Sequence, residues 1–83
     1  MEEAIIRFVN TELLAPGSPS VSATDEIVLD GTVDSLGVTR LVDFIQRELA
    51  VAIPAEDITI ENFRSIEALA AYVRSRRDVE PAR

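Results

Sequence analysis

A run of apolar residues at helical spacing constrains the fold of this chain more than any other feature. Downstream of Asp34-Ser35, apolar side chains recur at i, i+3, i+4, i+7 and i+11, namely at Val38, Leu41, Val42, Ile45 and Leu49. This spacing places them on one face of an α-helix. A side-chain oxygen of Asp34 or Ser35 can accept a hydrogen bond from the first turn. The pattern predicts an amphipathic helix from about Ser35 to Leu49, with Arg40, Asp43, Gln46 and Arg47 exposed.

An earlier segment, from about Glu2 to Leu14, has the same kind of pattern. Its apolar stripe consists of Ile5, Ile6, Phe8, Val9 and Leu13. Pro16-Gly17 ends the segment, because the residue before proline is pushed out of the α region and glycine permits a reversal of the chain. The first helix of the chain is therefore expected here.

The polar stretch from Pro16 to Val33 is predicted to be a long loop between these two helices. A loop of this length in a small domain needs apolar anchors of its own. We expect Ile27 and Leu29 to be the anchors. The alternative is a short β-strand over Ile27-Leu29, but the sequence offers no evident partner strand.

Two further helices are expected after Pro54. Because Pro54 disfavours a helical conformation at the residue before it, the stretch from Ala50 to Pro54 should be extended. If Ala50 closes the preceding helix in a left-handed conformation, it meets a steric cost of about 1 kcal/mol that glycine would avoid. Thr59 can cap a short helix that runs to about Arg64, and Ser65 can cap a last helix that runs to about Arg76. The inward stripe of this last helix is Ile66, Leu69, Ala70 and Val73, with Tyr72 nearer its edge.

Four amphipathic segments of this size need one shared core. The chain has 83 residues, 47% of them hydrophobic, which permits one modest core but no enclosed catalytic cavity. We therefore predict an all-α fold, a small four-helix bundle of three main helices and one short helix, with a long loop between the first two. Residues 1–77 are expected to form the domain and residues 78–83 a disordered tail.

Composition and charge narrow the function. The sequence contains no cysteine and no histidine, which removes thiol nucleophiles, disulfides, the usual imidazole base and most transition-metal sites. The formal net charge of −7 opposes nucleic-acid binding, because a polyanion needs a basic surface. No apolar run approaches membrane-spanning length, and the acidic start Met1-Glu2-Glu3 does not resemble a secretory signal. We expect a cytoplasmic monomer that is not itself an enzyme.

Ser35 is the candidate for chemistry because it stands where the second helix begins. A helix N-terminus leaves backbone N–H groups unpaired and carries the positive end of the helix dipole, so a phosphate esterified to Ser35 would lie in a favourable field. Asp and Ser are also ordinary helix-start residues, and capping alone would explain them.

The surrounding sequence resembles the phosphopantetheine-dependent carrier proteins, which carry acyl, aminoacyl or peptidyl groups. In this family a D-S-L tripeptide opens the second helix, and an apolar-patterned helix, an I-P step, an acidic D-I segment and a short last helix follow. The matching elements here are Asp34-Ser35-Leu36, Val38 to Leu49, Ile53-Pro54, Glu56-Asp57-Ile58 and Glu61 to Ile66. The resemblance covers about residues 27 to 73, and the joint pattern is far more specific than any single piece.

The resemblance implies a carrier whose Ser35 hydroxyl accepts 4′-phosphopantetheine from coenzyme A, through a separate phosphopantetheinyl transferase. The terminal thiol of that group would hold an acyl or aminoacyl cargo as a thioester. A ligase or acyltransferase would load the cargo, and a downstream synthase or transferase would receive it. The length of the chain and its Glu56 to Ile66 segment resemble stand-alone carriers of bacterial polyketide or nonribosomal-peptide pathways. Asp34 is expected to orient the site or to help hold the metal of the transferase.

Partner enzymes must dock close to Ser35, and the exposed residues around it are the expected contacts: Leu36, Thr39, Arg40, Asp43 and Arg47. Asp43 and Arg47 have the i, i+4 spacing of a helical ion pair, which would leave Arg40 and Leu36 more available. Arg40 and Arg47 also interrupt a face that is mostly acidic in fatty-acid carriers, so that role is less expected.

Three alternatives remain from the sequence. The first is a non-catalytic helical interaction module in which Ser35 is only a helix cap. A hydrolase with a Ser35 nucleophile would lack a histidine base. Glu56, Asp57 and Glu61 could bind a divalent cation, but carboxylates at the start of a helix are also favoured by its dipole, and we expect no metal site. Phe63 and Tyr72 are expected to pack in or beside the core.

Overall fold

A computed structural model gives the structure of the chain and describes residues 1–79, with side chains up to Arg77. Four α-helices form the described part, which contains no strand: α1 (Glu2–Phe8), α2 (Ser35–Glu48), α3 (Ile60–Phe63) and α4 (Ile66–Val79). A π-helical turn, η1 (Val9–Leu13), continues α1, and a 3₁₀ turn, η2 (Ala55–Asp57), precedes α3. The predicted all-α class, with three main helices and one short one, is confirmed.

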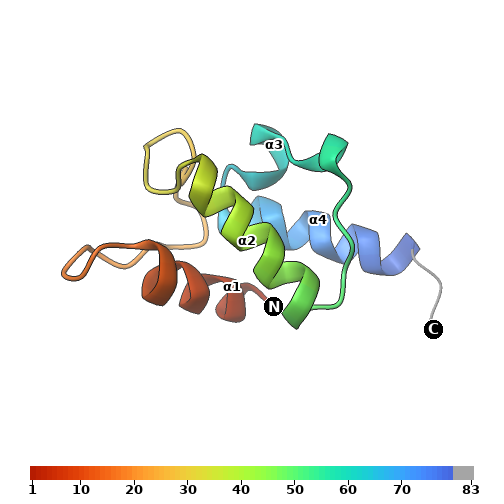
Figure 1. Cartoon of the computed structure of the whole chain (residues 1–83), viewed down its shortest axis with the longest axis horizontal. Coiled ribbons are helices and arrows are strands. Elements are labelled where there is room, and N and C mark those ends of the chain that lie inside the picture. Colours follow the sequence, from red (N-terminus) through yellow and green to blue (C-terminus); the bar gives the residue numbers. More distant parts are fainter. Residues whose placement is uncertain (80–83) are drawn as a thin grey trace.

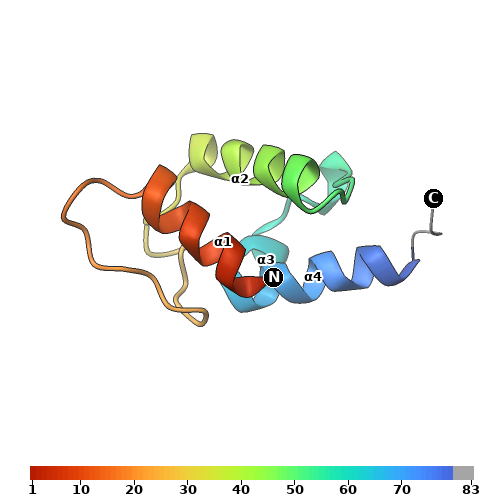
Figure 2. The ribbon, with the colours of Figure 1, turned by 90° about the horizontal axis from the view of Figure 1, so that it is seen from below.

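The helices enclose one core. α1 packs against α4 and α2, and α3 packs against α4. Figure 2 shows α2 lying along one side of the molecule, with α1 and α4 on the other. The buried apolar residues come from every helix and from the connecting segments: Ile5, Val9, Ile27, Val33, Leu41, Ile45, Val51, Ile53, Phe63, Ile66, Leu69, Ala70 and Val73. The predicted inward stripe of the last helix is therefore confirmed in full.

The first helix has the predicted extent but not the predicted regularity. It begins at Glu2 and ends when Leu14 adopts an extended conformation (φ −89°, ψ 148°), but its second half is the wider η1 turn. The N–H of Leu14 donates to the carbonyl of Val9 over 3.1 Å, an i to i+5 bond. Such a turn changes which backbone carbonyls remain unpaired at the helix end.

The long loop between η1 and α2, drawn in orange and yellow in Figure 1, is fixed to the rest of the molecule by hydrogen bonds. The side chain of Asn10 accepts from the N–H of Val21 at 3.0 Å, and the N–H of Ile27 donates to the carbonyl of Arg64 at 2.9 Å. The N–H of Glu67 donates to the carbonyl of Ala23, also at 2.9 Å. These bonds explain how a loop of this length stays ordered without a strand.

One of the two predicted loop anchors is wrong. Ile27 is fully buried, but Leu29 is 63% exposed, and Val33, 3% exposed, takes its place in the core. The N–H of Val33 donates to the carbonyl of Ile27 at 2.8 Å, and Gly31 reverses the chain between them with φ 83°. Leu29 therefore lies at the outside of a closed turn.

The segment after α2 begins with Ala50 in the left-handed conformation that the sequence offered as one possibility. Ala50 has φ 57° and is the one non-glycine residue of the described chain with a positive φ. Val51 and Ile53 then enter the core from a segment without regular secondary structure, and the side chain of Gln46 accepts from the N–H of Ile53 at 3.0 Å. Ala52, between them, faces solvent.

The caps of the last two helices are the predicted residues. Thr59 accepts from the N–H of Asn62, and Ser65 Oγ accepts from the N–H of Ala68 at 3.1 Å. α4 continues to Val79, three residues beyond the predicted end at Arg76. The expected tail, residues 78–83, thus starts inside the last turn of this helix, and residues 80–83 lie outside the described part of the chain.

Candidate functional site

The start of α2 is capped by Asp34 and not by Ser35. Asp34 has an extended backbone (φ −92°, ψ −173°), and its Oδ1 accepts a hydrogen bond from the N–H of Gly37 at 2.8 Å. Ser35 is the first residue of the helix and is exposed. Its hydroxyl makes no hydrogen bond with the described residues. The sequence left open which of the two residues caps the helix; the structure leaves the Ser35 hydroxyl available for chemistry.

Gly37 permits this close-packed helix start, and sequence reasoning missed it. Gly37 is buried, and a Cβ atom added there would lie 2.9 Å from Cγ1 of Val33 and 3.3 Å from Oδ1 of Asp34. The end of the loop and the capping carboxylate therefore approach the first turn of α2 more closely than a residue with a Cβ atom would allow. The available signal was a glycine in the first turn of an otherwise regular helix, where its propensity is poor.

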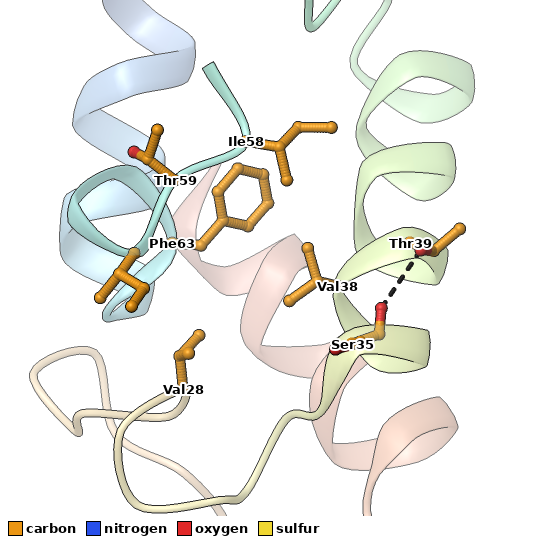
Figure 3. Close-up of a pocket in the computed structure, with 8 residues that line it drawn as sticks. Val28, Ser35, Val38, Thr39, Ile58, Thr59 and Phe63 are labelled. Carbon is orange, nitrogen blue, oxygen red and sulfur yellow. Dashed lines mark hydrogen bonds between the residues drawn. The ribbon is translucent and has the colours of Figure 1, made fainter. Parts of the chain in front are cut away.

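A cavity of about 270 Å³ lies beside Ser35, between α2 and the segment that contains η2 and α3. Figure 3 shows the side chains of Val38, Ile58 and Phe63 meeting there, with Ser35 at the edge. The lining is mostly apolar and is made by Val28, Ser35, Val38, Thr39, Ile58, Thr59, Ile60 and Phe63. The lining also contains the hydroxyl-bearing residues Ser35, Thr39 and Thr59, so an amphipathic chain attached at Ser35 would find both apolar surface and polar groups.

Two large apolar side chains that line this cavity, and Leu36 next to Ser35 in the chain, are exposed. Leu36 is 68% exposed, Ile60 57% and Ile58 40%. Leu36 was predicted as a contact residue, but Ile58 and Ile60 were not. Their signal in the sequence was an isoleucine on each side of the Thr59 cap, outside any helical stripe.

The predicted contact residues on α2 are not equally available. The Thr39 hydroxyl donates to the backbone carbonyl of Ser35 at 3.1 Å (Figure 3). Arg47 and Asp43 form the predicted ion pair, with Nε and Oδ2 2.9 Å apart and both side chains well exposed.

The expectation that Arg40 stays more available is wrong. Its Nη1 donates to the backbone carbonyl of Glu12 at 2.9 Å, and its Nη2 lies 3.5 Å from Glu12 Oε1. This carbonyl is one of those left unpaired at the end of η1, so Arg40 completes the end of the first helix.

Two acidic residues outside α2, Asp57 and Asp30, have structural partners. Asp57 Oδ2 accepts from the hydroxyl of Tyr72 at 2.5 Å, and no cluster of three potential metal-binding side chains occurs among the described residues. Hydrogen bonds from the hydroxyl and from the N–H of Thr32 lower the pKa of Asp30 below its ordinary value. Asp30 thus stays charged in the turn that leads to Ser35.

Comparison with known proteins identifies the family. No helix within residues 1–79 has the length and apolar character needed to span a membrane. No curated protein sequence matches the chain. A family model described as the phosphopantetheine attachment site matches residues 6–73, which is most of the chain. The chain therefore belongs to the phosphopantetheine-dependent carrier family, whose members are carriers and not catalysts and hold 4′-phosphopantetheine as a covalent cofactor.

Proposed function

We propose that Ser35 is the attachment residue and that the chain delivers acyl or aminoacyl intermediates between biosynthetic enzymes. The observation that carries the proposal is the Ser35 hydroxyl, which is exposed, unused in capping, and placed at the start of a 14-residue helix beside an apolar cavity. The family match supports a carrier in general. The residue, the cargo and the pathway are our proposal.

The first turn of α2 suits a phosphate ester. Asp34 accepts hydrogen bonds from two N–H groups of this turn. Its Oδ1 accepts from Gly37, and its carbonyl oxygen accepts from Val38. The N–H groups of Ser35 and Leu36 then remain for a phosphate, at the positive end of the helix dipole. The cofactor, when bound, supplies the thiol that this cysteine-free chain lacks, and so carries cargo as a thioester.

Other serines are less suited to the modification. Ser22 lies in the loop, where its hydroxyl donates to Asp25 at 3.0 Å, and Ser65 is buried and caps α4. Ser22 does not precede a helix, and the hydroxyl of Ser65, which does, is used as the cap. Ser18 and Ser20 are exposed, but they lie in the loop between η1 and α2.

The proposed partners and pathway depend on the same assignment of Ser35 as the attachment residue. A phosphopantetheinyl transferase would modify Ser35, and Asp34 would orient the site or help hold the metal of that enzyme. A ligase or acyltransferase would load the cargo, and a synthase or transferase would receive it. A bacterial polyketide or nonribosomal-peptide pathway is favoured over fatty-acid synthesis by the arginines on the exposed face of α2. Tethering replaces diffusion of the intermediate with a high effective concentration at each partner.

The test is intact mass measurement after incubation with coenzyme A and a broad-specificity phosphopantetheinyl transferase. The wild-type chain should gain one phosphopantetheine, and Ser35→Ala should gain none. Because Asp34 forms the cap, Ser35→Ala should keep the stability of the wild type, whereas Asp34→Ala should lose about 1 kcal/mol. Ser22→Ala is the matched control and should load normally.

Two outcomes contradict the proposal at different points. An unmodified wild-type mass would contradict the carrier role of this chain, and loading that persists in Ser35→Ala would contradict the attachment residue. The alternative of an interaction module in which Ser35 only caps α2 has lost its supporting observation, since the capping oxygen belongs to Asp34. Incubating the modified chain with candidate ligases and acyltransferases, followed by mass, would then identify the cargo.

A further inference from the structure

The two walls of the cavity beside Ser35 differ in how they are held. One wall belongs to α2, a 14-residue helix whose buried side packs into the core. The other wall is formed by the segment from η2 to α3, in which η2 has three residues and α3 has four. A single helical turn has little stability of its own, so contacts outside the segment must fix its position.

Asp57 makes one such contact and also accepts two hydrogen bonds from within the segment. It is the last residue of η2 and directly precedes Ile58, which lines the cavity. Its carboxylate accepts from the hydroxyl of Tyr72 on α4 at 2.5 Å. Its backbone carbonyl accepts from the side chain of Asn62 on α3 at 2.9 Å and from the N–H of Thr59 at 3.0 Å. One residue thus joins α4, η2 and α3.

We infer that Tyr72 is a positioning residue of the Ser35 site, which acts through Asp57 on the wall formed by Ile58 and Ile60. Neither Asp57 nor Tyr72 is among the residues that line the cavity. The effect of their hydrogen bond on the site is to hold the short wall segment against α4, and this fixes the width of the cavity. The relevance of the cavity width to function rests on the proposed carrier role. The tether, which is the hydrogen bond between Asp57 and Tyr72, can be tested without any attached group.

The strength of the bond supports a role in holding the wall. A hydrogen bond to a charged acceptor contributes more than a neutral one, and the Asp57–Tyr72 pair is partly buried, where water competes less. By contrast, Arg64 and Glu26, which join the end of α3 to the loop, have half-exposed side chains, and such pairs contribute little. The two tethers can therefore be separated by experiment.

Tyr72→Phe removes one oxygen atom and leaves the ring in place. Amide hydrogen exchange on the unmodified chain should accelerate by about tenfold or more over residues 57–62, in line with the loss of a hydrogen bond to a charged group. Amides of α2 should change much less. Dissolved xenon, which enters apolar cavities, should shift the methyl NMR signals of Val38 and Ile58 in the wild type, and these shifts should fall by about half in the variant.

Rescue and control variants separate positioning from general destabilisation. Asp57→Asn keeps an oxygen that can accept from Tyr72 but loses the charge, so exchange over residues 57–62 should accelerate less than in Tyr72→Phe, whereas Asp57→Ala should reproduce Tyr72→Phe. Combining Asp57→Ala with Tyr72→Phe should add little to either change, because both remove the same bond. Glu26→Gln removes the charge of the other tether and should leave exchange over residues 57–62 unchanged.

Unchanged exchange over residues 57–62 in Tyr72→Phe would overturn the inference, and so would an equal acceleration in α1, α2 and α4 or an unchanged xenon response. These measurements use the unmodified chain, so their results do not depend on the outcome of the loading assay. A chain that fails to gain phosphopantetheine would contradict the proposed function and leave the tether result intact.

Discussion

Ala50 is the residue at which a single substitution should stabilise the protein. It follows α2 with φ 57°, in the left-handed region that side chains with a Cβ atom rarely adopt. The residue before it, Leu49, still has a right-handed conformation with φ −104°. Ala50 is exposed, so its methyl group contributes no core packing that glycine would lose.

Two effects of Ala50→Gly oppose each other. A left-handed conformation costs an L-residue about 1–2 kcal/mol, and glycine avoids this cost. Glycine also gives the unfolded chain more freedom, which lowers the stability of the folded state by about 0.5–1 kcal/mol. The folded state should therefore gain about 0.5–1 kcal/mol. For a domain of this size, that corresponds to a rise in Tm of about 2–8 °C.

Urea and thermal unfolding followed by circular dichroism would measure the gain, and Ala52→Gly is the matched control. Ala52 is also an exposed alanine in the connection after α2, but its φ is not positive. Ala52→Gly should therefore lower the free energy of unfolding by about 0.5–1 kcal/mol. Equal losses in the two variants would refute the reasoning, because they would show that Ala50 is not strained.

Three other substitutions test the start of α2 and the turn before it. Gly37→Ala should lower the free energy of unfolding by about 1 kcal/mol, because the crowding with Val33 outweighs the better helix propensity of alanine; urea unfolding would measure it. Asp34→Asn keeps the cap, so its stability should match the wild type while its loading rate in the transferase assay falls. The lowered pKa of Asp30 means that its contribution to stability is present above its unfolded pKa and is lost as the pH falls through its folded pKa. The difference in free energy of unfolding between the wild type and Asp30→Ala should therefore become smaller as the pH is lowered through the acidic range.

Local patterns in the sequence were sufficient to predict the extents of the helices and the caps of the last two. Leu41 and Ile45 are buried as the spacing after Asp34-Ser35 predicts, and Thr59 and Ser65 each cap the helix that follows them. These signals work because helical period and capping depend on residues three or four positions apart.

The features that were missed depend on residues far apart in the chain. Arg40 bonds to Glu12 across 28 positions, and no pattern around either residue indicates it. Val33 is the buried anchor in place of the predicted Leu29, because the loop closes on itself through the bond from Val33 to Ile27. The order of apolar and polar residues in the sequence does not indicate this closure. The Ser35 cavity likewise needs α3 to be placed against α2.

The pairing of the charges on α2 changes which residues should attract a partner. Arg40 and Arg47 both have ion-pair partners, and exposed pairs contribute about 0–1 kcal/mol, whereas full burial of one leucine side chain contributes about 1.5–3 kcal/mol. Leu36 is 68% exposed beside the proposed attachment serine.

We therefore expect Leu36→Ala to weaken transfer with a native partner at both low and moderate salt. Arg40→Glu should weaken transfer mainly at low salt, because charges act chiefly on encounter. Arg40→Glu also places two carboxylates together at the end of η1, so Arg40→Gln is the control that removes the ion pair without the repulsion. Transfer kinetics that are unchanged in Leu36→Ala and Arg40→Glu at both salt concentrations would exclude this face of α2 as the docking surface.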